Sequence, residues 1–143
     1  MRLLLSTIAN ILACPLPKVD IIITGIKIDS RKVEPGNLFI ALDGECVNGH
    51  HYLAQARMAQ AGAALVSQRQ DDDLPQIVVN NVVTALGRIT AYWRQQCDVK
   101  VVAITGSNGK STVKEMVASI LGQFSSVLAT HGNLNNKLGV PLH

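Results

Sequence analysis

Aromatic side chains are scarce in this sequence of 143 residues, because phenylalanine, tryptophan and tyrosine together make up only 3% of it. The formal net charge is +3 at pH 7, and the basic residues are scattered along the chain rather than clustered. A nucleic-acid-binding surface combines basic and stacking side chains in one place. We therefore expect no nucleic-acid partner.

Cysteine is also sparse, and Cys14, Cys46 and Cys97 lie far apart in the sequence. Their odd number and the lack of any C-x-x-C spacing argue against a disulfide framework and against a zinc site. Unpaired cysteines are typical of a reducing compartment. We expect a cytoplasmic protein.

Long hydrophobic runs are missing, since no stretch approaches the roughly 18 apolar residues of a membrane span. We expect no membrane association. The opening MRLLLSTIANILACPL has an alternative interpretation, because an arginine, an apolar stretch and Cys14 resemble a bacterial lipoprotein signal of an exported protein. Ser6 instead predicts the N-cap of a short amphipathic helix that includes Ile8 and Leu12.

Apolar residues are abundant, at 48%, and they alternate between strand-like and helix-like patterns. Helices are predicted over Ala54–Ala61, ended by Gly62, and over about Val82–Gln96. Strands are predicted at residues 19–30 on both sides of a turn at Gly25, at Asn37–Leu42, at 63–67 and at 76–79. The nearly continuous apolar run 98–105 predicts a strand buried on both faces of a parallel sheet.

A glycine-rich loop follows this run and contains Gly106, Ser107, Asn108, Gly109, Lys110, Ser111 and Thr112. An amphipathic run then predicts a helix. Strand, glycine loop and helix are the order that a phosphate-binding loop needs, because glycines let backbone N–H groups turn inward and the helix N-terminus attracts anions. Lys110 would reach the β- and γ-phosphates of ATP, and the hydroxyl of Ser111 would bind the bridging Mg²⁺.

The match to the common P-loop pattern is partial, because Ile104 stands at the first glycine position and Gly106 lies inside the loop. Alternatively, the glycines only make a turn and Lys110 is solvated. A P-loop enzyme also needs an acidic residue on a neighbouring strand, whereas Glu115 is the only side-chain carboxylate after Lys110.

We therefore expect an α/β protein with a small amino-terminal α/β substrate domain, followed by the truncated start of a P-loop mononucleotide-binding parallel-sheet domain. The predicted boundaries are residues 1–80 and 81–143. Only residues 125–129 could form a further strand of the second domain, so the chain is interpreted as part of a larger enzyme.

Three stretches together resemble the Mur ligase superfamily, the ATP-dependent amide-forming enzymes of peptidoglycan synthesis. The loop TGSNGKST is similar to the superfamily's shortened P-loop. Residues 29–66 resemble the amino-terminal domain of members that bind UDP-N-acetylmuramoyl peptides. The ending THGNLNNKLGVPL is similar to the segment typical of the member that adds D-alanyl-D-alanine.

The resemblance implies an enzyme that activates the tripeptide carboxylate of UDP-N-acetylmuramoyl-tripeptide with ATP and joins it to D-alanyl-D-alanine. It implies ATP and Mg²⁺ as cofactors and a monomeric protein. The carboxy-terminal domain and a carbamylated lysine of the family would lie beyond His143, so we expect the chain alone to be inactive. The alternatives are a sister ligase that adds the third amino acid and a non-catalytic module that binds a nucleotide sugar.

The resemblance also implies residue roles. The P-loop, with Lys110 as its catalytic residue, would hold ATP and Mg²⁺. Substrate contacts are implied for three groups, namely Asp29, Ser30 and Arg31; Asn48, Gly49 and His50; and Asn133, Asn135 and Asn136. Asn48 departs from the aspartate usual in the family. Arg31 has an alternative role as a structural ion-pair residue, His50 as a hydrogen-bonded core residue, and the three asparagines as ordinary turn formers.

Overall fold

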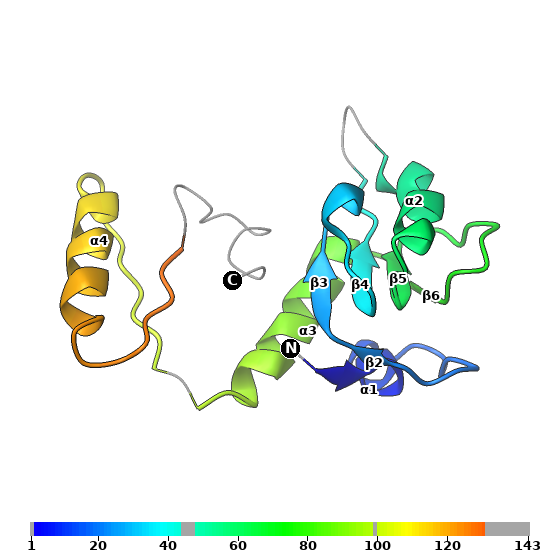
Figure 1. The fold of residues 1–143 in the computed structure, drawn as a ribbon, viewed down its shortest axis with the longest axis horizontal. Coiled ribbons are helices and arrows are strands. Elements are labelled where there is room, and N and C mark those ends of the chain that lie inside the picture. Colours follow the sequence, from blue (N-terminus) through cyan, green and yellow to red (C-terminus); the bar gives the residue numbers. More distant parts are fainter. Residues whose placement is uncertain (1, 44–47, 99, 131–143) are drawn as a thin grey trace. The chain divides into compact units, whose positions relative to one another are not determined.

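The computed structural model describes residues 2–43, 48–98 and 100–130. The chain divides into two compact units, Met1–Gln96 and Cys97–His143, which are described separately (Figure 1). Among the described residues, none of the helices combines the length and the apolar character needed to cross a bilayer.

The first unit is built on a parallel sheet whose strands follow each other in chain order. These strands are β3 (Gly25–Lys27), β4 (Asn37–Ile40), β5 (Ala63–Val66) and β6 (Gln76–Val78). Every residue of β4 and β5 is buried. Apart from Asn37 at the start of β4, both strands are apolar, because a central strand covered on both faces has no side that is open to water.

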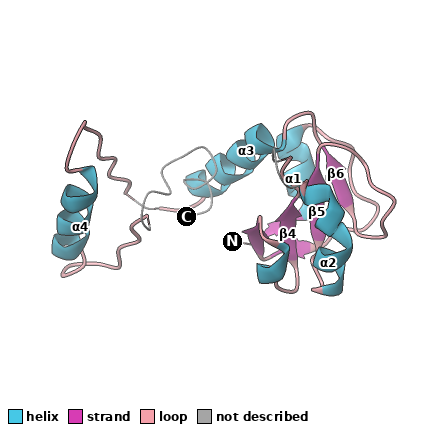
Figure 2. Ribbon diagram, turned by 90° about the horizontal axis from the view of Figure 1, so that it is seen from above, coloured by secondary structure: helices cyan, strands magenta, loops and turns pink. Residues whose placement is uncertain are grey.

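Helices cover both faces of the sheet (Figure 2). On one face, α2 (Leu53–Met58) packs through Leu53 and Ala56 against Phe39 and Val66. Successive side chains of a strand point to opposite faces, so Leu38 and Ile40 of β4 lie on the other face with Leu65. There α1 (Leu5–Leu12) packs against α3 (Val82–Gln95).

The amino-terminal helix α1 forms as expected, but its cap differs from the prediction. Leu4 occupies the N-cap position, and β1 (Leu3–Leu4) pairs antiparallel with β2 (Ile22–Ile23). Ser6 lies inside the first turn, where its backbone N–H and its hydroxyl donate to the carboxylate of Asp20 over 2.9 and 2.7 Å. The helix start is therefore satisfied by a residue distant in sequence, which local pattern cannot reveal.

The helix α3 confirms its predicted bounds to within one residue. Asn81 caps it, because its side-chain oxygen accepts the N–H of Thr84 over 2.8 Å. Arg88 donates to the carbonyl of Ile11 at the end of α1. The structure thus places α3 in the first compact unit, which runs to Gln96, whereas the predicted boundary after Asn80 assigned this helix to the second domain.

Two glycines have roles other than those predicted. Gly25 makes no turn but is the first residue of β3, paired with Asn37. The helix α2 ends at Met58, and the left-handed residue after it is Gln60, with φ +62°, rather than Gly62. The N–H of Gly62 instead donates to the carbonyl of Asn37 over 2.8 Å, at the start of β5.

The second unit contains α4 (Lys110–Leu121) as the only regular element among its described residues. The prediction of a buried strand over the apolar run 98–105 is wrong for this structure. Residues 100–105 form no strand, and Val101 and Val102 are 64% and 61% exposed. Residues 125–129 form no strand either. A parallel strand exists only when neighbours pair with it, and the described residues of this unit supply no such neighbour.

Candidate functional site

The loop 106–109 passes directly into α4, as a phosphate-binding loop requires. Gly109 adopts a left-handed conformation, with φ +74° and ψ +4°, and occupies the N-cap position of the helix. A residue with a Cβ atom is strained in this conformation. The glycine therefore allows the sharp turn that sets the first N–H groups of α4 at the end of the loop.

These first N–H groups are available for an anion. Within α4, the first intrahelical bond runs from the N–H of Val113 to the carbonyl of Gly109 over 3.0 Å. The N–H groups of Lys110, Ser111 and Thr112 precede it and have no helical carbonyl to reach. No heavy atom lies within 4 Å of the position that a Cβ on Gly109 would take. The loop is thus open on this side, and its backbone fits a phosphate group.

Lys110 bends back over the loop, where its Nζ donates to the carbonyl of Gly106. This contact folds the lysine side chain back onto the loop that precedes its own helix. The adjacent residues Ser111 and Thr112 are exposed. The predicted P-loop residues are therefore brought together, with a cation, two hydroxyl groups and a helix N-terminus around one loop.

A metal ion has few protein ligands here. Within the described residues, no group of three or more His, Cys, Asp and Glu side chains could hold a metal ion. The hydroxyl of Ser111 could supply one ligand, as a P-loop serine does when phosphate oxygens supply others. The donor set fits Mg²⁺ bound together with a nucleotide better than a metal held by the protein alone.

The remaining predicted residues that the structure describes lie in the first unit, beyond the carboxyl ends of its strands. Asp29, Ser30 and Arg31 follow β3, Asn48, Gly49 and His50 come after β4, and the end of β5 is followed by Ser67. Because β3, β4 and β5 are parallel, these segments share one edge of the sheet. We call Asp29–Arg31 and Asn48–His50 together the sheet-edge site. Open parallel sheets bind ligands at this edge.

The turn Asp29–Arg31 is held by its own side chains. Asp29 caps the short 3-10 helix η1 (Ser30–Lys32), because its carboxylate accepts the N–H of Arg31 over 3.0 Å. The guanidinium of Arg31 donates to both oxygens of the same carboxylate, each over 2.9 Å. These hydrogen bonds, first from the side chain and then from the backbone of Arg31, lower the pKa of Asp29 from 3.8 to about 2.

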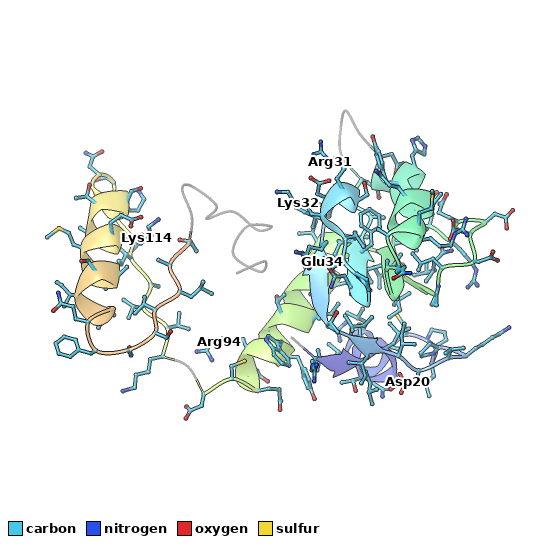
Figure 3. The ribbon with its side chains drawn as sticks, viewed as in Figure 1. Asp20, Arg31, Lys32, Glu34, Arg94 and Lys114 are labelled. Carbon is cyan, nitrogen blue, oxygen red and sulfur yellow. The ribbon has the colours of Figure 1, made fainter. Side chains whose placement is uncertain are left out.

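The structure therefore confirms the alternative role of Arg31 as an ion-pair residue. Its pKa is raised, mainly by the hydrogen bond to Asp29. The side chain is nevertheless 79% exposed, and it projects from η1 next to Lys32 (Figure 3). The pair holds the turn and still presents positive charge to solvent. Asp29, in contrast, uses both carboxylate oxygens within the turn.

His50 is a buried, hydrogen-bonded residue, only 6% exposed. Its Nε2 accepts the backbone N–H of Ser67 over 3.1 Å. Its Nδ1 lies 2.7 Å from Oδ1 of Asn48 and 3.0 Å from a carboxylate oxygen of Asp43. An acceptor at Nε2 and two oxygens at Nδ1 assign the neutral tautomer with its proton on Nδ1. The alternative of a core partner is confirmed for His50.

Asn48 and Gly49 make this arrangement possible. Asn48 caps the 3-10 helix η2 (Gly49–Tyr52) by accepting the N–H of His50 over 2.9 Å. Gly49 packs against the backbone after β4, where its N–H donates to the carbonyl of Leu42 over 2.8 Å. A Cβ on Gly49 would lie 2.6 Å from the nitrogen of Leu42, which is closer than real contacts allow.

Sequence reasoning missed three residues that support this edge. Asp43 accepts the hydroxyl of Ser67 over 2.7 Å, and Gln55 accepts the hydroxyl of Ser30 over 2.7 Å. No local spacing connects these residues, because their partners lie 24 and 25 positions away. The predicted substrate residues Asn133, Asn135 and Asn136 lie outside the described residues.

Comparison with known families decides the affiliation of the chain. The family model described as Mur ligase family, catalytic domain, matches residues 22–108, and the one described as Mur ligase middle domain matches residues 104–143. The chain belongs to the Mur ligase family. The family matches cover both the sheet-edge site and the loop at the start of α4.

Individual Mur ligases are similar over most of the chain. The UDP-N-acetylmuramoyl-tripeptide–D-alanyl-D-alanine ligase of Escherichia coli K12 is 47% identical over 138 residues, which are 96% of this chain and 30% of that protein. The chain thus spans about a third or less of the curated relatives' length.

Solved Mur ligase structures agree with the fold. A crystal structure of MurF from Acinetobacter baumannii is 37% identical with a TM-score of 0.87, and the match covers 99% of this chain and 32% of that chain. The MurF ligase of Thermotoga maritima in complex with ADP is 29% identical with a TM-score of 0.76, over 84% of this chain and 28% of that chain. The α/β fold with a parallel sheet is thereby confirmed.

Proposed function

We propose that this chain is the amino-terminal part of an ATP-dependent ligase that adds D-alanyl-D-alanine to UDP-N-acetylmuramoyl-tripeptide in peptidoglycan synthesis. The observation that carries the proposal is the 47% identity to a ligase of this name over 96% of the chain. The geometry of the glycine loop supports it independently, because a left-handed glycine, a helix N-terminus and a lysine meet there.

Residues Gly106–Thr112 are proposed to bind ATP. Backbone N–H groups at the start of α4 would hold the phosphates, and Lys110 would exchange its bond to Gly106 for bonds to phosphate oxygens. Ser111 is proposed as a ligand of Mg²⁺, which neutralises phosphate charge when bound. In this role Lys110 would be the catalytic residue, because its cation would lie where negative charge develops during phosphoryl transfer.

The proposed reaction has two steps. An oxygen of the tripeptide carboxylate attacks the γ-phosphorus of ATP, the bond to the β-γ bridging oxygen breaks, and ADP leaves with an acyl phosphate formed. The amine of D-alanyl-D-alanine then attacks the acyl carbon, loses a proton, and expels phosphate to leave an amide. The carboxylate is a poor electrophile, and phosphorylation gives it a good leaving group. The loop contributes positioning and charge neutralisation.

The sheet-edge site is proposed to bind the UDP end of the substrate. Arg31 has the exposed charge suited to a diphosphate, whereas Asp29, Ser30 and His50 have their side chains engaged within the protein. We propose the first compact unit, which runs to Gln96 and includes α3, as the substrate domain, and the second unit as the start of the ATP-binding domain. Asn133, Asn135 and Asn136 stay proposed as substrate contacts.

Several properties follow from this assignment as proposals. The enzyme is proposed to be cytoplasmic, because its nucleotide substrates are cytoplasmic. It is also proposed to be a monomer. Without further residues that bind Mg²⁺ and the acceptor amine, residues 1–143 alone are expected to bind the UDP substrate without ligating it.

Calorimetry and a coupled assay test the proposal. Residues 1–143 should bind UDP-N-acetylmuramoyl-tripeptide and show no ligation. In a full-length version, Lys110→Ala should abolish ligation and leave binding of the UDP substrate unchanged. Lys100→Ala is the matched control, because it removes an exposed lysine that precedes the loop. Ligation by residues 1–143 alone, or full activity in the Lys110→Ala enzyme, would contradict the proposal.

A further inference from the structure

Gln55 connects α2 to the turn that carries Arg31. Its side-chain oxygen Oε1 accepts the hydroxyl proton of Ser30 over 2.7 Å. Among the described residues, this is the only side-chain hydrogen bond between α2 and η1, which also pack against each other. The bond therefore fixes the turn against the helix layer of the first unit.

Ser30 and Arg31 are neighbours in the turn but differ in their exposure to solvent. Ser30 is 7% exposed, while the neighbouring side chain of Arg31 is 79% exposed. The hydroxyl of the buried Ser30 thus bonds to Gln55, which lies at the exposed surface of α2, and the Arg31 side chain extends into solvent. Asp29 and Arg31 hold the shape of the turn through their own bonds. These two bonds lie within the turn, whereas the bond from Ser30 to Gln55 joins the turn to α2.

We propose that Gln55 is a positioning residue for the nucleotide end of the substrate. It holds Ser30, and through Ser30 it sets the place of the Arg31 guanidinium at the sheet edge. The inference rests on the proposed binding of the UDP substrate at this edge. Removing the acceptor leaves a nearly buried hydroxyl without its partner, and a buried unpaired donor drives local rearrangement. The cation then no longer lies where the preformed site needs it.

The same helix supplies a matched control. Arg57, two residues further along α2, bonds through Nε to the carboxylate of Asp72 over 3.1 Å. Asp72 belongs to the loop between β5 and β6, away from η1 in sequence. Arg57→Met therefore removes a side-chain bond of α2 to another segment and leaves the bond to Ser30 intact.

The test is a double-mutant cycle measured by calorimetry with UDP-N-acetylmuramoyl-tripeptide. The full chain is compared with Gln55→Met, Ser30→Ala, the double variant and Arg57→Met, at a temperature where thermal scans show every variant folded. We expect Gln55→Met to weaken binding roughly two- to tenfold, the range of one net hydrogen bond. The double variant should bind no more weakly than the weaker single variant, because both changes break one connection. Arg57→Met should bind like the unaltered chain.

The outcomes distinguish the positioning role of Gln55 from the proposed binding of the UDP substrate at the sheet-edge site. Unchanged affinity in Gln55→Met, strictly additive losses, or an equal loss in Arg57→Met would overturn the role of Gln55 while leaving the UDP site in place. Absence of binding by the unaltered chain would overturn both. Should Gln55→Met unfold at the working temperature, Gln55→Ala replaces it in the same cycle with the same expected loss.

Discussion

Arg31 binds both carboxylate oxygens of Asp29, two positions before it in the chain, through its Nε and Nη2 atoms at 2.9 Å each. One side-chain pair thereby closes the turn after β3. Arg31 therefore has two properties at once: it holds the turn through Asp29, and it presents its positive charge to solvent.

Titration of Asp29 tests this pair. The pKa of Asp29 is about 2 in the folded chain and 3.8 in the absence of these bonds, so the folded pKa lies below the unfolded one. The bonds to Arg31 therefore stabilise the fold fully above pH 3.8, and this contribution is lost as the pH falls from there toward 2. Carbon-detected NMR should find the midpoint of Asp29 near 2. In Arg31→Ala the midpoint should return toward 3.8, and an unshifted midpoint would contradict the pairing.

His50 and His51 provide a contrast between a buried and an exposed imidazole. His50→Ala removes the partner of the Ser67 N–H and of the Asn48 and Asp43 oxygens. We expect the free energy of unfolding to fall by about 2–4 kcal/mol, measured by urea denaturation. His51→Ala, at an exposed position, should change it by less than about 0.5 kcal/mol. Equal effects of the two substitutions would refute the assignment of His50 as a structural residue.

Gly49 and Gly87 make a second matched pair. Gly49→Ala places a methyl group 2.6 Å from the nitrogen of Leu42, so we expect a loss of at least about 2 kcal/mol of stability. Gly87 lies within α3, where an added methyl group would have no heavy atom within 4 Å, and Gly87→Ala should stabilise by about 0.5–1 kcal/mol. Chemical denaturation of both variants gives the comparison, and a tolerated Gly49→Ala would show that the backbone contact is looser.

Substitutions of Gly109 test whether the left-handed backbone conformation of the glycine loop is needed for nucleotide binding. Its φ of +74° costs an L-residue roughly 1 kcal/mol or more, although space for the side chain is open. Asparagine tolerates this conformation better than alanine. Nucleotide affinity, measured by calorimetry with ATP and Mg²⁺ in a full-length version, should therefore decrease in the order glycine, asparagine, alanine. Equal affinities of all three would mean that the left-handed turn is not needed for binding.

Much of the first unit could be predicted from local pattern. The strands β4, β5 and β6 follow from short apolar runs, and the helix α3 follows from apolar residues at helical spacing. The apolar run 98–105 could not be judged in the same way. Whether such a segment pairs as a strand depends on other strands beside it, and the described residues of its unit contain none.

In the candidate site, too, features set by neighbouring residues in sequence could be predicted, and features set by distant residues could not. The loop 106–112 was recognisable because glycines, lysine and hydroxyl residues lie together in sequence. The sequence alone does not decide the role of His50, because only the fold brings Ser67 and Asp43 to its ring. Gln55 gave no sequence signal at all, since a glutamine on a helix is ordinary until its partner is known.

The order of the sheet has a consequence for synthesis of the protein. Since β3, β4, β5 and β6 lie side by side in the order in which they leave the ribosome, each new strand meets an edge that is already exposed. No strand must be inserted between two others, and the loop-closure entropy of each addition stays small. The layer can thus grow one strand at a time during translation, before the glycine loop has been made.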